Sequence, residues 1–326
     1  MNKIKNAFSK IKASDEYKNA LTKNLETNPI KSKSTNNKSY YKPAIVVATI
    51  LLVIIGVVMT NTRNKSSINS VSIDKIELPK GDGAGKGKML PLIVYKKNIY
   101  TLSATTIDPK NSKKLLGEKL GTTKDNLNEW SKQKDYAKEF ASTIGKQDIY
   151  SVKGYDKDFR IMTNTLNQDG TTYPQFYDCL NGITVNNGSD IFEKLNLKGN
   201  VVTAKFRLFS DWNNGVDVFY PIKDTNLINK FVKALNTSTP YLQESLTSLL
   251  GDYQNDSQYR ELTLELKDGC KVTISFLKSG YVYYGSQNVY FKIDSKISDN
   301  LWSQLNIKWQ KNNTSVKTGV KWVSIL

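Results

Sequence analysis

The chain of 326 residues contains no histidine. This absence excludes Ser-His-Asp and Cys-His catalysis, and every metal site that depends on an imidazole ligand. Cysteine is almost as scarce, with only Cys179 and Cys270, which lie 91 residues apart. A disulfide between them is permitted in an oxidising compartment, and two buried free thiols are the alternative.

One long stretch lacks charge, Asn, Gln and Pro altogether. It runs from Ala44 to Thr60, AIVVATILLVIIGVVMT. As a helix it would be roughly 25 Å long, which is enough to span a bilayer core with help from its flanks. Tyr40, Tyr41 and Lys42 precede it and suit a membrane interface. A buried core helix and a signal peptide are the alternatives. We favour a transmembrane helix, because the run is apolar all round, starts late and is followed by no A-x-A site.

Charge predicts the orientation of this helix. Residues 1–43 carry ten lysines against three acidic residues, a net charge of +7. The positive-inside rule therefore predicts that this arm is cytoplasmic and that residues 61–326 lie outside the membrane. The whole chain has a formal charge of +17, which leaves +10 for the outside part. That excess would attract anionic cell-wall polymers or lipid headgroups. Nucleic acid is not expected as a partner, since most of the net charge lies on the outer side.

The arm contains two short apolar stripes at helical spacing, within residues 1–28. Their members are Ile4, Phe8 and Ile11 in the first stripe, and Tyr17, Leu21 and Leu25 in the second. Helices this short are not stable alone in water. We therefore expect them to pack on each other, on a membrane surface or on a partner protein. Residues 30–42 are polar and without period, as in a flexible tether.

The opening KIKNAFSKIKASDEYKNALTKNLE, Lys3 to Glu26, together with this layout resembles the zinc-free, membrane-anchored anti-sigma factors of Gram-positive bacteria. The resemblance implies that the arm binds a sigma factor through its apolar stripes and that the outside domain receives a signal. The zinc-bearing class is excluded, because the arm has neither Cys nor His. The alternative is a membrane-anchored cell-surface binding module without a cytoplasmic partner, and an enzyme is a third, weaker reading.

The outside part is predicted to be α+β, with a stalk over residues 61–90 and subdomains over 91–209 and 210–326. Both halves contain a short helix that opens with Ser-Asp, so a duplicated unit is one reading and a single large domain the other. Four segments resemble an outside domain of uncharacterised Gram-positive membrane proteins and lipoproteins: Thr105–Gly121, Glu129–Ile144, Lys153–Thr163 and Cys179–Ile183. This resemblance implies a location and an α+β fold, but no chemistry.

Local patterns predict the elements of the outside part. Hairpins are expected over 91–105, turning at Lys97-Asn98, and over 261–277, turning at Lys267-Asp268-Gly269. Further strands are expected over 71–78, 148–152, 159–164, 173–180, 201–209, 281–284 and 289–293. Helices are expected over 109–116, 126–144 and 225–235, and the first of them is closed by residues 117–123. Further helices are expected to begin at Thr239-Pro240 and after caps at Ser189 and Ser298.

No catalytic constellation emerges from the residue types, and we predict no enzyme activity, cofactor or metal. The run GDGAGKGK, Gly81 to Lys88, lacks the Walker spacing and is read as a flexible loop. Three acidic residues and four tyrosines are candidate site residues, but solvated turns and ordinary sheet packing explain them better: Asp156, Asp158, Asp211, Tyr281, Tyr283, Tyr284 and Tyr290. Three serines have no base in view: Ser103, Ser142 and Ser151.

Overall fold

A computed structural model describes residues 70–76, 90–125, 127–128, 131, 134–135 and 138–306. The chain divides into two compact units, and every described residue belongs to the second unit, Val47–Leu326. The described region is α+β with antiparallel sheets, which confirms the predicted class. Within these ranges no helix is both long and apolar enough to cross a membrane. The predicted span Ala44–Thr60 and the whole arm lie outside the described residues.

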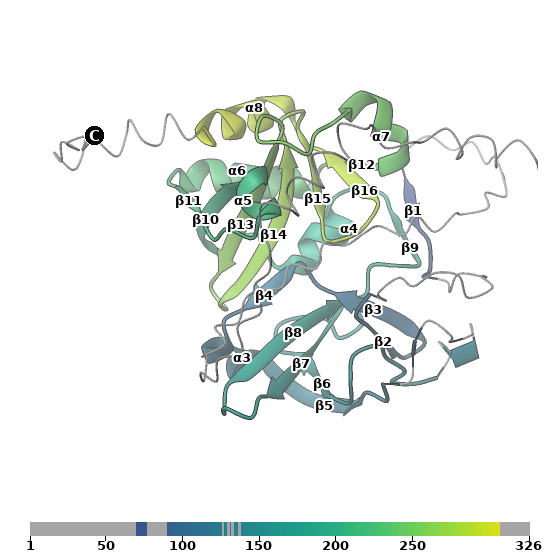
Figure 1. Ribbon diagram of the computed structural model, residues 1–326. Coiled ribbons are helices and arrows are strands. Elements are labelled where there is room, and N and C mark those ends of the chain that lie inside the picture. The colour runs from purple at the N-terminus through teal and green to yellow at the C-terminus, as the bar shows by residue number, and fades with distance from the viewer. Residues whose placement is uncertain are drawn as a thin grey trace, which may run out of the picture. The chain divides into compact units, whose positions relative to one another are not determined.

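The first sheet has six strands in the order β2-β3-β8-β7-β6-β5, all antiparallel (Figure 1). Its strands are β2 Leu92–Tyr95, β3 Asn98–Leu102, β5 Leu116–Thr122, β6 Asp148–Val152, β7 Arg160–Leu166 and β8 Thr172–Asp178. The β2–β3 hairpin turns at Lys96-Lys97, one residue before the predicted position. Both residues have positive φ, 50° and 63°, as a two-residue turn of the primed type requires.

The second sheet has eight strands in the order β11-β10-β13-β14-β15-β16-β12, and β4 also pairs with β14. Its strands are β4 Thr105–Ile107, β10 Val201–Leu208, β11 Tyr220–Ile222, β12 Thr239–Leu242, β13 Tyr259–Leu266, β14 Cys270–Leu277, β15 Tyr281–Tyr284 and β16 Val289–Lys292. The β13–β14 hairpin is confirmed, with Gly269 at φ 87°, where a side chain would be strained. A third, two-stranded ladder joins β1 Val71–Ile73 to β9 Ile183–Val185.

The described helices are short. They are α3 Pro109–Leu115, α4 Ser189–Phe192, α5 Phe209–Asn213, α6 Thr225–Asn236, α7 Gln243–Leu250 and α8 Ser295–Gln304, with a 3₁₀ turn, η2, at Glu193–Leu195. The Asp224 side chain caps α6 by accepting the Leu227 amide. The caps predicted at Ser189 and Ser298 were wrong by one and four residues, because Gly188 and Asp294 occupy those places.

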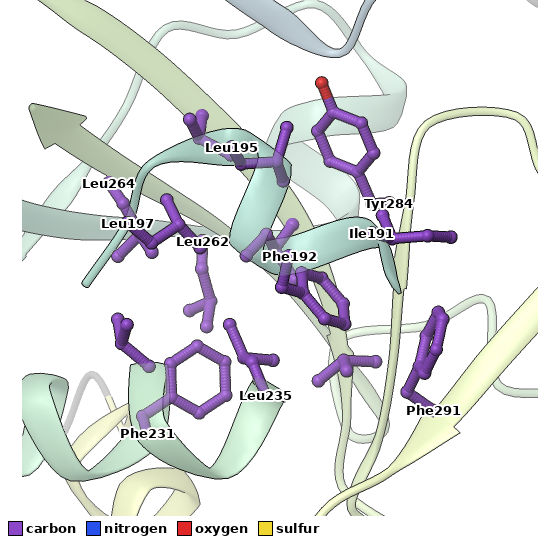
Figure 2. Packing of buried hydrophobic residues seen from close by; sticks show 14 of the residues in the cluster. Ile191, Phe192, Leu195, Leu197, Phe231, Leu235, Leu262, Leu264, Tyr284 and Phe291 are labelled. Atoms are coloured by element: carbon purple, nitrogen blue, oxygen red, sulfur yellow. The ribbon is translucent and has the colours of Figure 1, made fainter. Parts of the chain in front are cut away.

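The largest hydrophobic core is built around α4. Figure 2 shows Phe192 of α4 among Phe231 and Leu235 of α6 and Phe291 of β16. The Phe192 and Phe291 rings meet edge to face, with their centroids 4.9 Å apart. The apolar stripe of α6 faces this core, as its period predicts.

Both large sheets contribute to this one core. Phe159, which directly precedes β7, and Phe176 of β8 come from the first sheet. Both belong to the same cluster as Leu262 and Phe276 of the second sheet. Strand pairing also crosses the predicted boundary after residue 209, because β4 pairs with β14 and β10 pairs with β13. That boundary therefore does not separate the sheets.

Two predicted helical segments were wrong, and the segment 117–123, expected to close a helix, forms most of a strand. Residues 117–122 form β5 on β6, and residues 239–242 form the edge strand β12 on β16. An edge strand tolerates Pro240, which has no amide hydrogen to donate. Residues 138–144 are not helical, because Phe140 and Ala141 exchange backbone hydrogen bonds with Val94 of β2. In each case the backbone forms its hydrogen bonds with a distant strand.

Candidate functional site

Two buried charges lie where the two large sheets meet. The side chains of Arg160 at the start of β7 and Asp178 at the end of β8 are 0% and 3% exposed. Arg160 Nε donates to Asp178 Oδ1 over 2.7 Å, and Arg160 Nη2 donates to Asp178 Oδ2 over 2.9 Å. This paired geometry is the strongest form of a carboxylate–guanidinium contact. Burial lowers the pKa of Arg160, but the Asp178 carboxylate, together with Tyr284 and Tyr155, outweighs burial, so the pKa is raised.

Three hydroxyl groups complete this cluster. Arg160 Nη2 also donates to Thr105 Oγ1 over 3.0 Å and to the Tyr284 hydroxyl over 3.1 Å. Asp178 Oδ2 accepts from Ser103 Oγ over 2.6 Å and from Tyr284 over 2.8 Å. Because Tyr284 belongs to β15 and Arg160 to β7, the network joins the second sheet to the first. We call these five residues the junction network.

Aromatic rings enclose the guanidinium of Arg160. The Cζ atom lies 4.8 Å from the Tyr155 ring centroid, 5.1 Å from that of Phe159 and 5.2 Å from that of Phe176. Nη1 is buried and has no hydrogen-bond partner among the described residues. The negative faces of the rings supply its electrostatic contact instead.

A small cavity opens beside Tyr155. It has a volume of about 150 Å³, and three segments distant in sequence line it. These are the β6–β7 turn, the loop after η2 and the β13–β14 hairpin turn, with Lys153, Gly154, Tyr155, Asn196, Asn200, Leu266, Lys267 and Asp268. Two hydrogen bonds hold the segments together: Asn196 Nδ2 donates to the Gly154 carbonyl, and the Lys267 amide donates to the Asn200 carbonyl.

Most of the surface that lines this cavity is apolar, although two lysines and one carboxylate are among the lining residues. The Tyr155 hydroxyl donates to Asp268 Oδ2 over 2.9 Å, and the Cys270 amide donates to Asp268 Oδ1 over 2.8 Å. Burial raises the pKa of the Tyr155 hydroxyl, which therefore stays protonated and acts as a donor. Among the described residues, no three Cys, Asp or Glu side chains are close enough to hold a metal ion.

The sequence-predicted partner-binding residues Ile4, Phe8, Ile11, Tyr17, Leu21 and Leu25 lie outside the described residues. Cys179 and Cys270 are described, and both are free, buried thiols. Cys179 packs with Tyr95 and Tyr100, whereas Cys270 belongs to the large core around α4. The structure therefore has no bond between them, and the free-thiol alternative describes them.

Most of the other candidate side chains make local structural contacts, whereas Asp211 Oδ2 is buried without a hydrogen-bond partner among the described residues. Asp158 pairs with Lys96 in an exposed turn. Ser142 and Ser151 accept backbone amides from Asp125 and Glu118. The four tyrosines do not line one groove: Tyr281, Tyr284 and Tyr290 are buried, Tyr283 lies against Tyr290, and Tyr284 belongs to the junction network. Of the serines, Ser103 alone joins that network.

Both thiols are expected to be unreactive while the chain is folded. Burial raises the pKa of Cys270 to about 12 and also raises the pKa of Cys179, so the nucleophilic thiolate is scarce at pH 8. Ellman's reagent should therefore detect no fast-reacting thiol in the native protein and two thiols in denaturant. A protein that shows fewer than two thiols in denaturant without reductant would contradict the free state.

Sequence reasoning missed Arg160 and Asp178, although a signal was present. Among 47 basic residues only four are arginine, and the three that the structure describes, Arg160, Arg207 and Arg260, are all buried. Arginine suits buried ion pairs better than lysine does. In a chain this rich in lysine, an arginine therefore marks a candidate buried charge: Arg160 and Arg207 pair with carboxylates, and Arg260 donates to backbone carbonyls.

Comparison of the chain with protein-family models, curated proteins and solved structures finds no match.

Proposed function

We propose that this protein is a single-pass membrane regulator of the anti-sigma-factor type. Its arm, residues 1–43, lies in the cytoplasm and binds a sigma factor, and its α+β region lies outside the membrane and senses a ligand. One observation carries the regulatory part: the sequence of the arm has two apolar stripes, yet each predicted helix is too short to be stable without a surface to cover its stripe. The resemblance of Lys3–Glu26 to zinc-free anti-sigma factors supports the same assignment.

The described region suits the sensing part of this proposal. The cavity beside Tyr155 is bounded by segments from both sides of the sheet junction. The ring of Tyr155 also contacts Arg160 of the junction network. A ligand in the cavity would therefore touch the side chain that lies against the contact between the two sheets. In place of the two predicted subdomains, we propose one outside region whose two large sheets meet at this network.

The second candidate is a membrane-anchored cell-surface binding module without a cytoplasmic partner. The same cavity supports it, and the net charge of the outside part suits anionic envelope material. The two candidates differ in the arm. For a module that is merely anchored, the apolar stripes are dispensable and only the lysines matter.

A pull-down with the tagged full chain, solubilised from its native membrane, separates these candidates. We expect the natural chain to retain a sigma factor and the variant Phe8→Glu with Leu21→Glu to lose it, since both changes place charge on the apolar stripes. The matched control is Asn6→Glu with Asn19→Glu, which adds the same charge on the opposite side of each helix. Equal retention by both variants, or no retained sigma factor at all, would contradict the regulatory proposal.

A further inference from the structure

A second hollow lies at one end of the first sheet, and it shares no lining residue with the cavity beside Tyr155. Its volume is about 470 Å³, within the range of about 300–1,000 Å³ that is typical of ligand pockets. The strands β5, β6 and β7 lie side by side (Figure 1), and β5 ends, β6 begins and β7 ends at this hollow. We call it the strand-end groove. Its lining residues are Thr122, Lys146, Gln147, Asp148, Tyr150, Asn164, Thr165 and Leu166.

Five of these side chains lie on the same face of the first sheet. The ring of Tyr150 packs against the large core around α4, which lies on one face of this sheet. Because side chains alternate between the two faces along a strand, Asp148 shares this face, and the β6–β7 register adds Asn164 and Leu166. Thr122 joins them, since its Oγ1 atom donates to Asp148 Oδ1 over 2.7 Å. The five side chains therefore reach the groove from one side of the sheet.

The side chain of Asn164 has an unmet hydrogen bond. Its Oδ1 atom is buried and has no partner among the described residues. Buried polar atoms are paired in the great majority of cases, so an unpaired one calls for an explanation. A ligand in the groove with a hydroxyl or amide hydrogen would donate to this oxygen. The unpaired atom therefore points to a ligand that carries hydrogen-bond donors.

The carboxylate at the groove is already compensated. Asp148 Oδ2 lies 2.7 Å from Lys119 Nζ, and Oδ1 accepts from Thr122. The contact with Lys119 is the main cause that lowers the pKa of Asp148, so the carboxylate stays ionised and only accepts hydrogen bonds. A cation would have to compete with Lys119, and an anion would meet the Asp148 carboxylate. Lys146 is exposed and lies in the loop before β6. A neutral ligand therefore suits the groove best.

The groove also presents apolar surface. The Tyr150 ring is half-buried, and Leu166 is 69% exposed. A sugar ring combines hydroxyl donors at its rim with an apolar C–H face, which packs on aromatic and aliphatic side chains. An extended peptide would need a free strand edge for its backbone, whereas β6 and β7 each pair with a strand on both sides. A neutral sugar ring therefore matches both the polar and the apolar parts of the groove.

From these observations we infer that the strand-end groove binds one neutral sugar ring, either free or as a unit of a glycan. A ring hydroxyl donates to Asn164 Oδ1, and the C–H face of the ring lies on Tyr150 and Leu166. This inference goes beyond the proposed function, because the groove is a second site, separate from the cavity beside Tyr155. It depends neither on the arm nor on the side of the membrane.

Saturation-transfer NMR with glucose and with N-acetylglucosamine tests this site, using the purified full chain in a detergent without a sugar headgroup. Saturable binding of at least one sugar is expected. Asn164→Leu should weaken it about two- to tenfold, which corresponds to one uncharged hydrogen bond. The same variant should keep the urea unfolding midpoint of the natural chain, because Oδ1 makes no hydrogen bond within the described residues. A lower midpoint without weaker binding would contradict the role of Asn164.

A second variant changes the groove at an exposed position. Leu166→Glu places a charge on its apolar side and should weaken sugar binding at least tenfold. The matched control is Leu249→Glu, because Leu249 is 68% exposed on α7 and lines neither hollow. The control should bind sugar like the natural chain. Equal weakening by both variants would overturn the inference.

Co-sedimentation with cellulose and with chitin identifies the source of the sugar ring. Retention of the natural chain and of Leu249→Glu, but not of Leu166→Glu, would support the site and assign it to a glycan chain. Saturable NMR binding without retention would assign it to a free sugar. Absence of binding to all four probes would overturn the inference. None of these readouts involves a sigma factor, so failure here is distinguishable from failure of the arm to bind one.

Discussion

Replacing Asp178 with Asn is expected to lower the free energy of unfolding by about 3–5 kcal/mol. The substitution keeps the shape of the side chain but leaves the guanidinium of Arg160 as an uncompensated charge with 0% exposure. Within the described residues Arg160 forms no ion pair with a second carboxylate, so the lost charge is not replaced. The effect is measured by urea denaturation of the full chain, followed by tryptophan fluorescence.

The control for Asp178→Asn is Asp158→Asn, which removes the partner of Lys96. That pair is exposed on both sides, and solvent screens it, so the unfolding midpoint should stay close to that of the natural chain. A double variant, Arg160→Met with Asp178→Leu, should be more stable than Asp178→Asn, because it removes both charges. If Asp178→Asn behaved like Asp158→Asn, the junction network would not join the sheets.

Replacing Phe192 with Ala is expected to cost about 3–5 kcal/mol of stability. The ring is fully buried at the centre of the large core, and it contacts Phe291 of the second sheet. The helix α4 has only four residues, so its position depends on this packing and not on its own backbone. The substitution removes the contacts of the ring and leaves a cavity that the surrounding strands cannot fill.

Two further variants test why Phe192→Ala loses stability. Leu249→Ala removes an apolar side chain that is 68% exposed on α7, and should change stability by only about 0.5 kcal/mol. Phe192→Leu keeps most of the buried volume and should be clearly milder than Phe192→Ala. If Phe192→Ala, Phe192→Leu and Leu249→Ala all unfolded at the same urea concentration, the result would contradict the packing of α4 between α6 and β16.

The local elements that sequence predicted well share one property: neighbouring residues determine them. Strands β6 and β14 follow from β-rich composition, the β13–β14 turn from Gly269, and α6 from an apolar stripe at helical spacing. The short strands β9 and β11 were missed, because three residues are too few to show a period. The helix expected over 126–144 fails in its described part for a different reason. Apolar residues at this spacing make contacts with distant parts of the chain, as Phe140 does by stacking on Tyr95.

The sequence by itself determined the α+β class, the absence of histidine chemistry, and the expectation of a membrane span with a basic arm. Only the tertiary structure decided which strands share a sheet, that Arg160 pairs with Asp178, and that residues 153–155, 196–200 and 266–268 enclose one cavity. The physical reason is the range of the interactions. Turn chemistry and periodicity act over a few residues. Burial of a charge pair and closure of a cavity depend on segments up to about 110 residues apart, and no local pattern records their pairing.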